Sequence, residues 1–508
     1  MVTRCLHSQT CWAIPNRVTF RHGHDTTELD AFAKNACFTR IVITYIPFGE
    51  EYARLSIFEP GEGTLVVVPS LSLPQDELGR IVGARWYEER LLFLLLTLRD
   101  PGVKVIYLSS TPIDPAIIDY YLTFLPDPDD AAKRLELIAL DEPAAQPLTR
   151  ALLARPDVLA RIRGAIDGDA CMVPFVLSEL EERLASSLNV PLYGPATSLA
   201  YYGSKSGSRE VGTAAGVPMA RGFGDLRTLT EIEDAIESLP GERVIVKLND
   251  GYSGLGNAIL TKDDRSLTSF SAAGETWTSF TDKIAERGAV VEEFIEHRPL
   301  YYPSALARVS PGGHSEVLAT HDQVLGGPNN DVYQGCTFPA APEYRAEVGA
   351  SARKIAEILA GKGVIGMFGM DFFAMKTDAG YAALLCEINL RIGGTTHPYG
   401  AALLTTGAVY DPGSGLLMAG DQPKYYTATD NCAATSLVGR TPGEVVRTVE
   451  RLGLGFDAET RTGNVFHLLG AVPEHGKLGF TSIGDSRRAA DELHALTRLA
   501  LCGIPALQ

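Results

Sequence analysis

The chain has 508 residues, a formal net charge of −17 and a pI near 5.1. An acid excess of this size excludes nucleic acid and anionic membranes as general partners, so any phosphate site requires a local concentration of lysine and arginine. The length suggests about three domains. An apolar fraction of 45% and a charged fraction of 21% are ordinary for a globular protein.

Neither a membrane span nor a secretion signal is expected. The longest apolar run, Leu91–Leu98, is too short to cross a bilayer. The N-terminal segment has no apolar core followed by a small-residue cleavage site. The eight cysteines show no CxxC and no Cys/His ligand spacing. We therefore expect reduced thiols and a cytoplasmic protein.

Residues 61–198 predict a doubly wound α/β domain. Thr64–Pro69 is a continuous apolar run, the pattern of a strand buried on both faces. Val103–Leu108 is expected to be the next buried strand and Leu135–Leu140 a third, and stretches of helical spacing separate the three. No GxGxxG motif is present, so nothing supports dinucleotide binding. Residues 1–60 are left as an unassigned N-terminal extension, in which Ile41–Tyr45 is compatible with a strand.

Residues 199–430 change to strands punctuated by glycine, and residues 431–508 are typical of a small α+β unit. In the latter, two stretches have helical spacing, Glu444–Leu452 and Ser486–Leu501. Strands are expected at Asn464–Gly470 and Lys477–Ile483. His467 and His475 of this unit are expected to be structural histidines rather than catalytic bases.

A β-hairpin that carries acidic side chains is predicted late in the glycine-rich region. The segments Asp371–Met375 and Ala382–Asn389 are rich in apolar and aromatic residues, and turn-forming residues separate them. Folding the hairpin about Ala379 places Asp371 directly opposite Glu387.

Alternation along the second strand places Leu385, Glu387 and Asn389 on one face. Like charges directly opposite each other destabilise a sheet, so Asp371 and Glu387 with an amide beside them require a cation. Their hard oxygen ligands fit Mg²⁺ or Mn²⁺ and not zinc. The alternative is an exposed hairpin whose acids face water, but apolar neighbours on both strands favour a face beside a core.

A small polar run, Gly203–Arg209, precedes a predicted helix. Such a run offers backbone N–H groups to an anion, with Lys205 as a point charge. The alternative is a plain loop.

A strand that ends at Lys247 is followed by a glycine-rich turn and a returning strand. Gly251, Gly254 and Gly256 allow close backbone approach to a ligand. Because strand follows strand, this is not a Walker A loop, and a flexible flap over phosphates fits better. The alternative is a glycine-rich hairpin whose lysine points to solvent.

The stretch Ala289–Glu296 is an apolar strand that turns acidic. It suits a hinge whose backbone contacts an adenine edge and whose acids bind the adenine amino group and the ribose hydroxyls. The alternative is an amphipathic edge strand.

In this order, the four motifs resemble the ATP-grasp superfamily over residues 200–420. A narrower similarity to the pheganomycin-type peptide ligases extends over most of the chain after residue 60. It rests on six motifs: Val66–Leu73, Tyr87–Leu92, Asp119–Leu122, Ser204–Arg209, Gly463–Leu468 and Gly476–Gly484. The resemblance implies a pre-ATP-grasp domain, an ATP-grasp fold of two α+β subdomains and a small α+β C-terminal domain.

The resemblance also implies roles for individual residues. The ATP phosphates would be bound by Lys205 and Lys247 under the turn that contains Ser253, Gly254 and Gly256. The adenine edge would be held by Glu292, Glu293 and Ile295, and the ribose by Glu296. Two divalent ions would be bound by Asp371, Glu387 and Asn389. Arg391 matches the family arginine that meets the substrate carboxylate or its acyl phosphate.

The sequence departs from the family at one basic position. Many relatives carry a third basic residue on the strand after the hinge, and this chain has no lysine there. Arg308 or the segment His321–Gln323 could take its place.

The activity that the resemblance implies is ATP-dependent carboxylate–amine ligation through an acyl phosphate, with release of ADP and phosphate. It would join an amino acid or modified amino acid to a peptide or amino acid in natural-product biosynthesis. Two alternatives stay open: a nucleotide-binding protein without turnover, and a ligase with a thiol or bicarbonate acceptor. Partners would be small molecules, and the oligomeric state is open, with the two-fold homodimer common among large enzymes as one form.

Overall fold

The computed structural model describes residues 46–73, 82–141, 146–250, 256–264, 268–271, 274–326, 332–378 and 380–502. All of them lie within the unit Thr44–Gln508. The predicted strand Ile41–Tyr45 lies outside the described residues. Within these ranges, no helix has both the length and the apolar character that a bilayer crossing requires.

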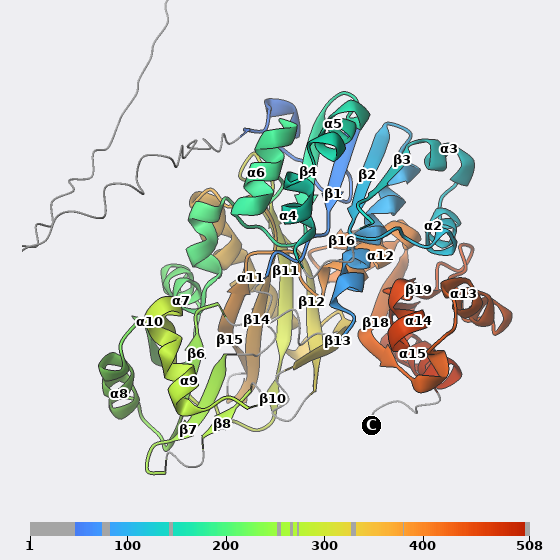
Figure 1. The fold of residues 1–508 in the computed structure, drawn as a ribbon. Helices are drawn as coiled ribbons and strands as arrows, with labels where there is room; N and C mark the ends of the chain where they lie inside the picture. Colours follow the sequence, from blue (N-terminus) through green and yellow to red (C-terminus); the bar gives the residue numbers. More distant parts are fainter. Residues whose placement is uncertain are drawn as a thin grey trace, which may run out of the picture. The chain divides into compact units, whose positions relative to one another are not determined.

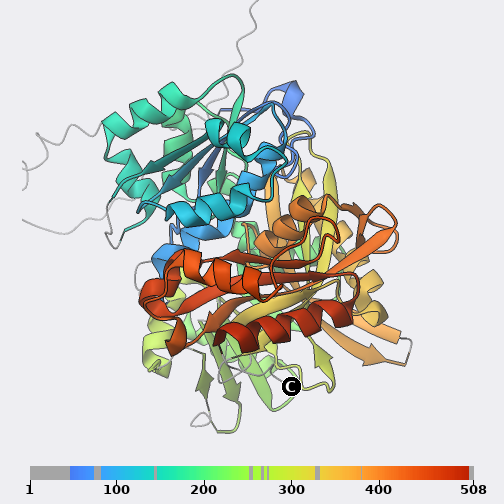
Figure 2. The ribbon, with the colours of Figure 1, turned by 90° about the vertical axis from the view of Figure 1, so that its right-hand side faces the viewer.

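The N-terminal domain is built on a parallel sheet with helices on both faces (Figures 1 and 2). Its strands, in the order β3-β2-β1-β4, are β1 (Gly63–Val68), β2 (Val103–Ser109), β3 (Leu135–Ala139) and β4 (Ala170–Pro174). Its helices are η2 (Ala84–Arg99), a 3₁₀-helix, and α2 (Pro115–Leu122), α3 (Pro128–Lys133), α4 (Leu148–Leu153), α5 (Pro156–Ala165) and α6 (Glu179–Leu188). The doubly wound prediction is confirmed, whereas β4 was not anticipated.

Burial on two faces explains the continuous apolar run of β1, whereas β3 lies at the sheet edge and its Leu137 is 37% exposed. Leu65 and Val67 of β1 pack into the core that contains η2 and α2. Val66 and Val68 pack into a second core with α4, α5 and α6. Because successive side chains point to opposite faces, both parities of the strand must be apolar.

A smaller antiparallel sheet follows, with strand order β5-β9-β6-β7-β8. Its strands are β5 (Gly222–Leu226), β6 (Arg243–Leu248), β7 (Asn257–Thr261), β8 (Ser269–Phe270) and β9 (Ala289–Glu293). Its helices are α8 (Leu229–Ser238), α9 (Trp277–Asp282) and α10 (Ile284–Arg287). Since β9 pairs with both β5 and β6, it is an interior strand, and the edge-strand alternative is wrong.

The large sheet of the described chain has 11 strands in the order β10-β14-β11-β12-β13-β18-β17-β16, with β15 paired to β14 and β20 paired to β18 and β19. Its first strands are β10 (Leu300–Tyr301), β11 (Pro303–Val309), β12 (Ser315–Gly326), β13 (Val332–Phe338), β14 (Gly366–Thr377) and β15 (Gly380–Asn389). The later strands are β16 (Val409–Asp411), β17 (Leu416–Ala419), β18 (Gln422–Ala433), β19 (Gly463–His467) and β20 (Lys477–Gly484). The helices of this region are α7 (Lys205–Ala214), α11 (Pro342–Gly361), α12 (Thr396–Thr406), α13 (Pro442–Arg451), α14 (Val472–His475) and α15 (Arg487–Cys502).

The C-terminal segment is continuous with this sheet. Strand β18 runs across residue 430, where the sequence predicts a domain boundary, and β20 pairs with β18. Helix α15 covers β18 and β20, as Figure 2 shows in dark red. The sequence predicts reduced thiols, but the structure joins Cys432 and Cys502 in a disulfide, because α15 packs along β18 and brings their Cα atoms to 6.9 Å.

The described part of the predicted N-terminal extension belongs to the main core. Leu55, Ile57 and Phe58 are buried there, and the Phe58 ring contacts Phe93 of η2 and Tyr399 of α12. Residues 46–60 therefore pack against two other parts of the chain rather than extending from them.

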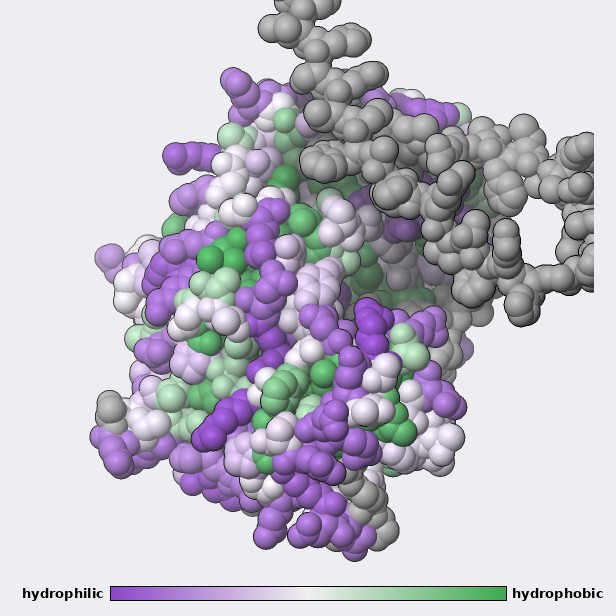
Figure 3. Space-filling view, turned by 90° about the vertical axis from the view of Figure 1, so that its left-hand side faces the viewer, coloured by the Kyte–Doolittle hydropathy of each residue, from purple (hydrophilic) through white to green (hydrophobic). Residues whose placement is uncertain are grey.

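One side of the surface is mixed in character. Figure 3 shows the side that lies at the left of Figure 1, and hydrophobic residues there form small separate groups among hydrophilic ones. Where the described residues are not covered in this view, no broad apolar face is visible.

A buried carboxyl group links η2 to the C-terminal segment. Because its pKa is raised, we expect the stability of the fold to depend on pH. Glu89 is 3% exposed, and its Oε2 accepts the Gly470 backbone N–H at 3.0 Å. Burial raises the pKa of Glu89 to about 8, against about 4.3 in an unfolded chain. The folded state therefore keeps a proton that the unfolded state loses, so stability falls as pH rises between these values.

We expect Glu89→Gln to weaken this pH dependence, because glutamine keeps the acceptor and cannot ionise. The measurement is the urea midpoint at pH 5.5 and pH 8.5 for both proteins. Some dependence should persist through Glu88, since burial raises its pKa to about 7. Glu492→Gln, at a side chain 59% exposed, is the control and should behave as wild type. An unchanged pH response in Glu89→Gln would contradict the assignment.

Candidate active site

The predicted acidic hairpin is present, formed by β14 and β15. The two strands pair antiparallel, and Asp371 lies directly opposite Glu387 as the sequence predicts. Phe372 and Ile388 are each 1% exposed and pack into the core behind the hairpin. The turn residue Ala379 lies outside the described residues. The two acids stand over a packed core, and the alternative of a fully exposed hairpin is wrong.

A β-bulge interrupts the predicted alternation of side chains on β15, and the prediction for Leu385 is therefore wrong. The register shifts between Asp371 and Phe372, so that Phe372 pairs with Leu385 while Asp371 still pairs with Glu387. Leu385 is consequently buried in the core at 4% exposure, not on the face of Glu387. The extra residue of the bulge is Cys386, whose Sγ lies 3.7 Å from Lys247 Nζ. Sequence alternation alone could not reveal this extra residue.

Donors from three elements converge on the two carboxylates. Lys205 Nζ forms an ion pair with Glu387. Gln323 Nε2 of β12 donates to Asp371 Oδ1 at 2.9 Å, and Asn389 Nδ2 donates to Asp371 Oδ2 at 3.0 Å. Burial raises the pKa of Asp371, and the charges of Lys205 and Arg391 oppose that rise. The oxygen set of Asp371, Glu387 and Asn389 suits a hard divalent cation.

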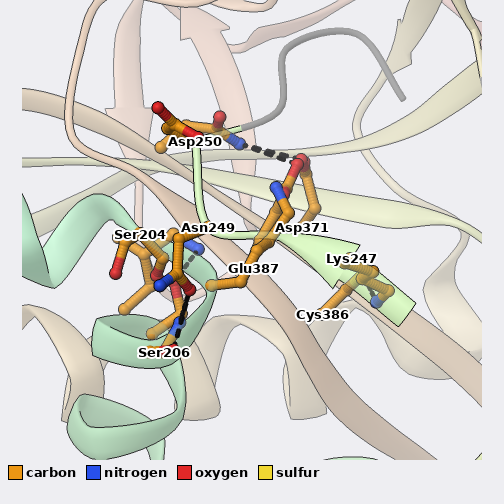
Figure 4. A network of polar contacts seen from close by, with 12 residues as sticks. Ser204, Ser206, Lys247, Asn249, Asp250, Asp371, Cys386 and Glu387 are labelled. Carbon is orange, nitrogen blue, oxygen red and sulfur yellow. Dashed lines mark hydrogen bonds and ion pairs between the residues drawn. The ribbon is translucent and has the colours of Figure 1, made fainter. Parts of the chain in front are cut away.

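Lys205 begins helix α7, so the polar run is the first turn of the helix rather than a loop before it. Ser204 Oγ caps the helix by accepting the Gly207 N–H at 3.0 Å. Asn249, which follows β6, accepts from the backbone N–H and the hydroxyl of Ser206 at 3.0 and 2.7 Å. Figure 4 shows Ser204 and Ser206 beside Asn249, next to the strands that carry Glu387 and Lys247. These contacts cap the helix and fix its start against the end of β6.

Lys205 is held in a buried, electropositive place. Burial and the neighbouring Lys247 lower the pKa of Lys205 to about 8. A lysine in such a place gains from a negatively charged ligand, because the ligand offsets both effects.

Lys247 does not point to solvent, so that alternative is wrong. Its side chain is 7% exposed, and Nζ lies 2.7 Å from Glu292 Oε2. Arg209 Nη1 of α7 binds the other oxygen, Glu292 Oε1, at 2.6 Å. Burial lowers the pKa of Lys247, but attraction to Cys386 and Glu292 outweighs it, and the net shift is upward. Both oxygens of the Glu292 carboxylate are thus paired with positively charged side chains of the protein itself.

The predicted glycine flap is only partly described. Strands β6 and β7 pair antiparallel as predicted, and Lys247 lies opposite Asn257. Ser253 and Gly254 lie outside the described residues. Gly256 has a φ of +94°, which favours glycine, and its carbonyl accepts the Leu248 N–H at 2.9 Å. The two strands that flank the predicted flap are therefore present.

The remaining hinge residues lie at the end of β9. Glu293 accepts the Arg221 backbone N–H at 3.0 Å, and its own N–H donates to Arg221 O. Ile295 is half-buried just beyond the strand. Glu296 is 63% exposed and lies 3.3 Å from Arg243 Nη1. Only Glu292 of the hinge acids is buried in the cluster.

Of the two predicted catalytic arginines, the structure brings one to the cluster. Arg391 Nη2 donates to Asn389 Oδ1 at 3.2 Å, beside the hairpin acids. Arg308 lies four residues along β11 from Ser304, the residue that pairs with Asp371, and it forms an ion pair with Glu316. The segment His321–Gln323 is the other candidate for the missing lysine; its His321 is buried against Tyr426, whereas its Gln323 reaches Asp371.

From the sequence no role is expected for Arg209 and Asn249, whereas Gln323 belongs to the segment suggested in place of the missing lysine; all three shape this cluster. Arg209 and Asn249 stand inside motifs that were singled out, Asn249 two residues after Lys247. Their partners lie 83 and 43 residues away in the chain, which only the fold brings together.

Because the ion pairs of the hinge differ in burial, we expect substitutions of its acids to lower the free energy of unfolding by different amounts. Glu292→Ala should lower the free energy of unfolding by about 3–5 kcal/mol, because it leaves the buried Lys247 without its carboxylate. Glu296→Ala, at an exposed pair, should cost about 0.5 kcal/mol or less. Urea denaturation followed by circular dichroism measures both, and equal losses would contradict this placement.

Comparisons with known proteins agree with this geometry. Residues 214–395 match the family model described as ATP-grasp domain, and residues 444–497 match the PGM1 C-terminal domain. The chain is 31% identical over 475 residues to an L-propargylglycine–L-glutamate ligase of Streptantibioticus cattleyicolor, covering 89% of this chain and 97% of that protein. It is 22% identical to IQ motif-containing protein H of Danio rerio, covering 65% of this chain and 37% of that protein.

Solved structures share the fold at low identity. The biotin carboxylase domain of a Hydrogenobacter thermophilus 2-oxoglutarate carboxylase, solved with MgADP and bicarbonate, superimposes with a TM-score of 0.56 at 15% identity, over 86% of this chain and 90% of that one. A biotin carboxylase from Campylobacter jejuni gives 0.55 at 14% identity, over 85% and 90%. The acidic hairpin, the lysines around it and the full-length similarity to a ligase lead to one conclusion: the chain belongs to the ATP-grasp superfamily, among the pheganomycin-type peptide ligases.

Proposed function

We propose that this chain is an ATP-dependent ligase that joins a carboxylic acid to an amine, with release of ADP and phosphate. The observation that carries the proposal is the convergence of Asp371, Glu387 and Asn389 with Lys205 and Arg391 on one face of the large sheet. This set combines ligands for a cation with positive groups for two anionic reactants, ATP and a carboxylate.

Asp371, Glu387 and Asn389 would hold two Mg²⁺ ions, and Mn²⁺ could replace them. When bound, such ions offset the negative charge of the ATP phosphates. The two carboxylates lie opposite each other, with Asp371 accepting from Gln323 and Asn389 and Glu387 paired with Lys205. Lys205, now paired with Glu387, would then be available to the phosphates.

The nucleotide would lie between the small sheet and the hairpin. Lys247 would add positive charge beneath the phosphates, and the turn with Ser253, Gly254 and Gly256 would cover them. Because the Glu292 carboxylate is used by Lys247 and Arg209, its contribution to the adenine edge would come from the backbone. Glu293 and Ile295 would complete that edge, and the exposed Glu296 would bind the ribose.

Arg391 would bind the carboxylate substrate and then its acyl phosphate. In the first step, a carboxylate oxygen attacks the γ-phosphorus and the bond to the ADP oxygen breaks. In the second step, the amine nitrogen attacks the acyl carbon, phosphate leaves, and the amine proton passes to phosphate or solvent. The charge of Arg391 favours the first step because it brings two anions together. Water must be excluded to protect the intermediate.

The substrate class is proposed from the relative in Streptantibioticus cattleyicolor, which is named as a ligase of two amino acids, L-propargylglycine and L-glutamate. The donor would be an amino acid or a modified amino acid, and the acceptor an amino acid or peptide, in cytoplasmic natural-product biosynthesis. A homodimer is a further part of the proposal, since two-fold assemblies are common.

The proposal is tested by incubating the full chain with ATP, Mg²⁺ and panels of amino acids and short peptides. We expect phosphate release that depends on a particular pair, a product with the mass of acid plus amine minus water, and ADP rather than AMP. ADP formed without a condensed product under every acceptor would instead support a non-amine acceptor. ATP binding without turnover across the panel would overturn the ligase proposal.

Glu387→Gln should reduce ADP formation by at least about 100-fold, because it removes one charged ligand of the ions. Circular dichroism should show an unchanged fold, since glutamine preserves the shape of the side chain. Unaltered turnover in this variant would remove the metal assignment.

Arg391→Ala and Arg308→Ala form a matched pair. Arg391→Ala should lower kcat far more than it weakens ATP binding, because its charge acts on the carboxylate. Arg308→Ala should retain most turnover, because Arg308 pairs with Glu316 away from the hairpin. Steady-state kinetics and nucleotide titration separate the two effects, and a collapse of ATP affinity in Arg391→Ala would reassign Arg391 to the phosphates.

A further inference from the structure

A second polar cluster lies where β18, β19 and α12 meet, apart from the acidic hairpin. It consists of His397 in the first turn of α12, Asp430 in β18 and His467 at the end of β19. Their side chains are 3%, 3% and 6% exposed. None of the three has a role in the proposed ligation.

Three donor atoms of this cluster converge on one point. His397 Nε2 lies 2.9 Å and His467 Nε2 lies 2.7 Å from the same oxygen, Asp430 Oδ1. The two Nε2 atoms are 3.1 Å apart. Three neighbouring ligands about 2.1 Å from an octahedral ion are separated by about 3.0 Å. The triangle therefore has the size of one face of a metal coordination sphere.

Hydrogen bonding alone does not satisfy all three contacts. A neutral imidazole has one N–H. If both histidines donate from Nε2 to Asp430 Oδ1, two N–H groups crowd one oxygen with their nitrogens 3.1 Å apart. If either Nε2 is an acceptor, its lone pair faces the carboxylate oxygen with no proton between them. With a bound cation, all three lone pairs point to the same positive charge.

Arg90 orients the carboxylate of this cluster and sets the charge around it. Arg90 Nη2 holds the other carboxylate oxygen, Asp430 Oδ2, at 2.5 Å, which fixes the orientation of the acid. Arg90 Nε is buried and has no partner among the described residues. A divalent ion next to Arg90 leaves an excess of positive charge, so the remaining coordination positions favour an anion such as hydroxide or a carboxylate.

We propose that His397, Asp430 and His467 bind a divalent transition-metal ion. Two imidazoles and one carboxylate select ions of the Fe²⁺, Co²⁺ and Zn²⁺ type over Mg²⁺. This site is distinct from the hard-oxygen site at Asp371 and Glu387. The ion ties β18 and β19 of the C-terminal segment to α12, which begins directly after the loop that carries Arg391.

The metal also has a structural consequence for that loop. Thr396 Oγ1 accepts the Gly393 N–H at 3.1 Å, and the Tyr333 hydroxyl donates to Gly394 O at 2.9 Å. A metal bond at His397 adds a third anchor next to these two. The site is thus a positioning element for the residues beside Arg391, and it does not touch substrate.

The test is a Co²⁺ titration of the EDTA-treated full chain in excess Mg²⁺, followed by visible absorption. We expect one equivalent of Co²⁺ with d–d bands, displaced by Zn²⁺. His397→Ala and His467→Ala should each weaken Co²⁺ binding by at least about 100-fold, because each removes a ligand. His475→Ala, a histidine of the same region outside the cluster, is the matched control and should bind as wild type. Glu387→Gln should also bind Co²⁺ normally, which separates this site from the hairpin.

X-ray absorption of the Zn²⁺-loaded wild-type protein provides a readout that does not depend on any variant folding. We expect two imidazole nitrogens and no sulfur around the ion. No tightly held equivalent in the wild-type protein would overturn the proposal and leave a hydrogen-bonded network. Sulfur ligation, or Co²⁺ binding unchanged in folded His397→Ala and His467→Ala, would overturn it equally.

Discussion

The opposition of Asp371 and Glu387 across β14 and β15 is the constraint on which the site depends. Two carboxylates at directly opposed positions repel each other, so the pair is stable only if positive charge or hydrogen-bond donors reach it. Lys205, Gln323 and Asn389 supply them from α7, β12 and β15. The same negative patch would suit a divalent ion, so the feature that is costly for the sheet is the one that fits the proposed chemistry.

The two lysines of the site lie in different electrostatic surroundings, and their pKa values shift in opposite directions. Lys247 lies between Glu292 and Cys386, and its net pKa shift is upward, which favours its charged form. Lys205 lies close to that charge in a buried place, and its pKa falls to about 8. A bound nucleotide would relieve this strain on Lys205. Arg209 completes the arrangement by holding Glu292 from α7, which ties the small sheet to the helix that carries Lys205.

The C-terminal segment is part of the same hydrogen-bonded structure as the site. Strand β18 pairs with β13 on one side and with β20 on the other, so the large sheet passes through the predicted boundary. The N-terminal domain reaches this region too, through Glu89 on Gly470 and Arg90 on Asp430. These buried contacts couple three parts of the chain around the start of α12, which explains why a polar cluster with His397 and His467 is enclosed there.

The sequence by itself determined the elements whose pattern is local. The strands β1, β2 and β3 and the hairpin with Asp371 opposite Glu387 all follow from side-chain periodicity and turn chemistry. Periodicity could not reveal the bulge at Cys386, since an extra residue shifts the register without changing composition. It could not find the partners of Lys247 or the position of Arg308 either. Those depend on which distant strands and helices pack together, and burial and charge pairing in the folded chain decided them.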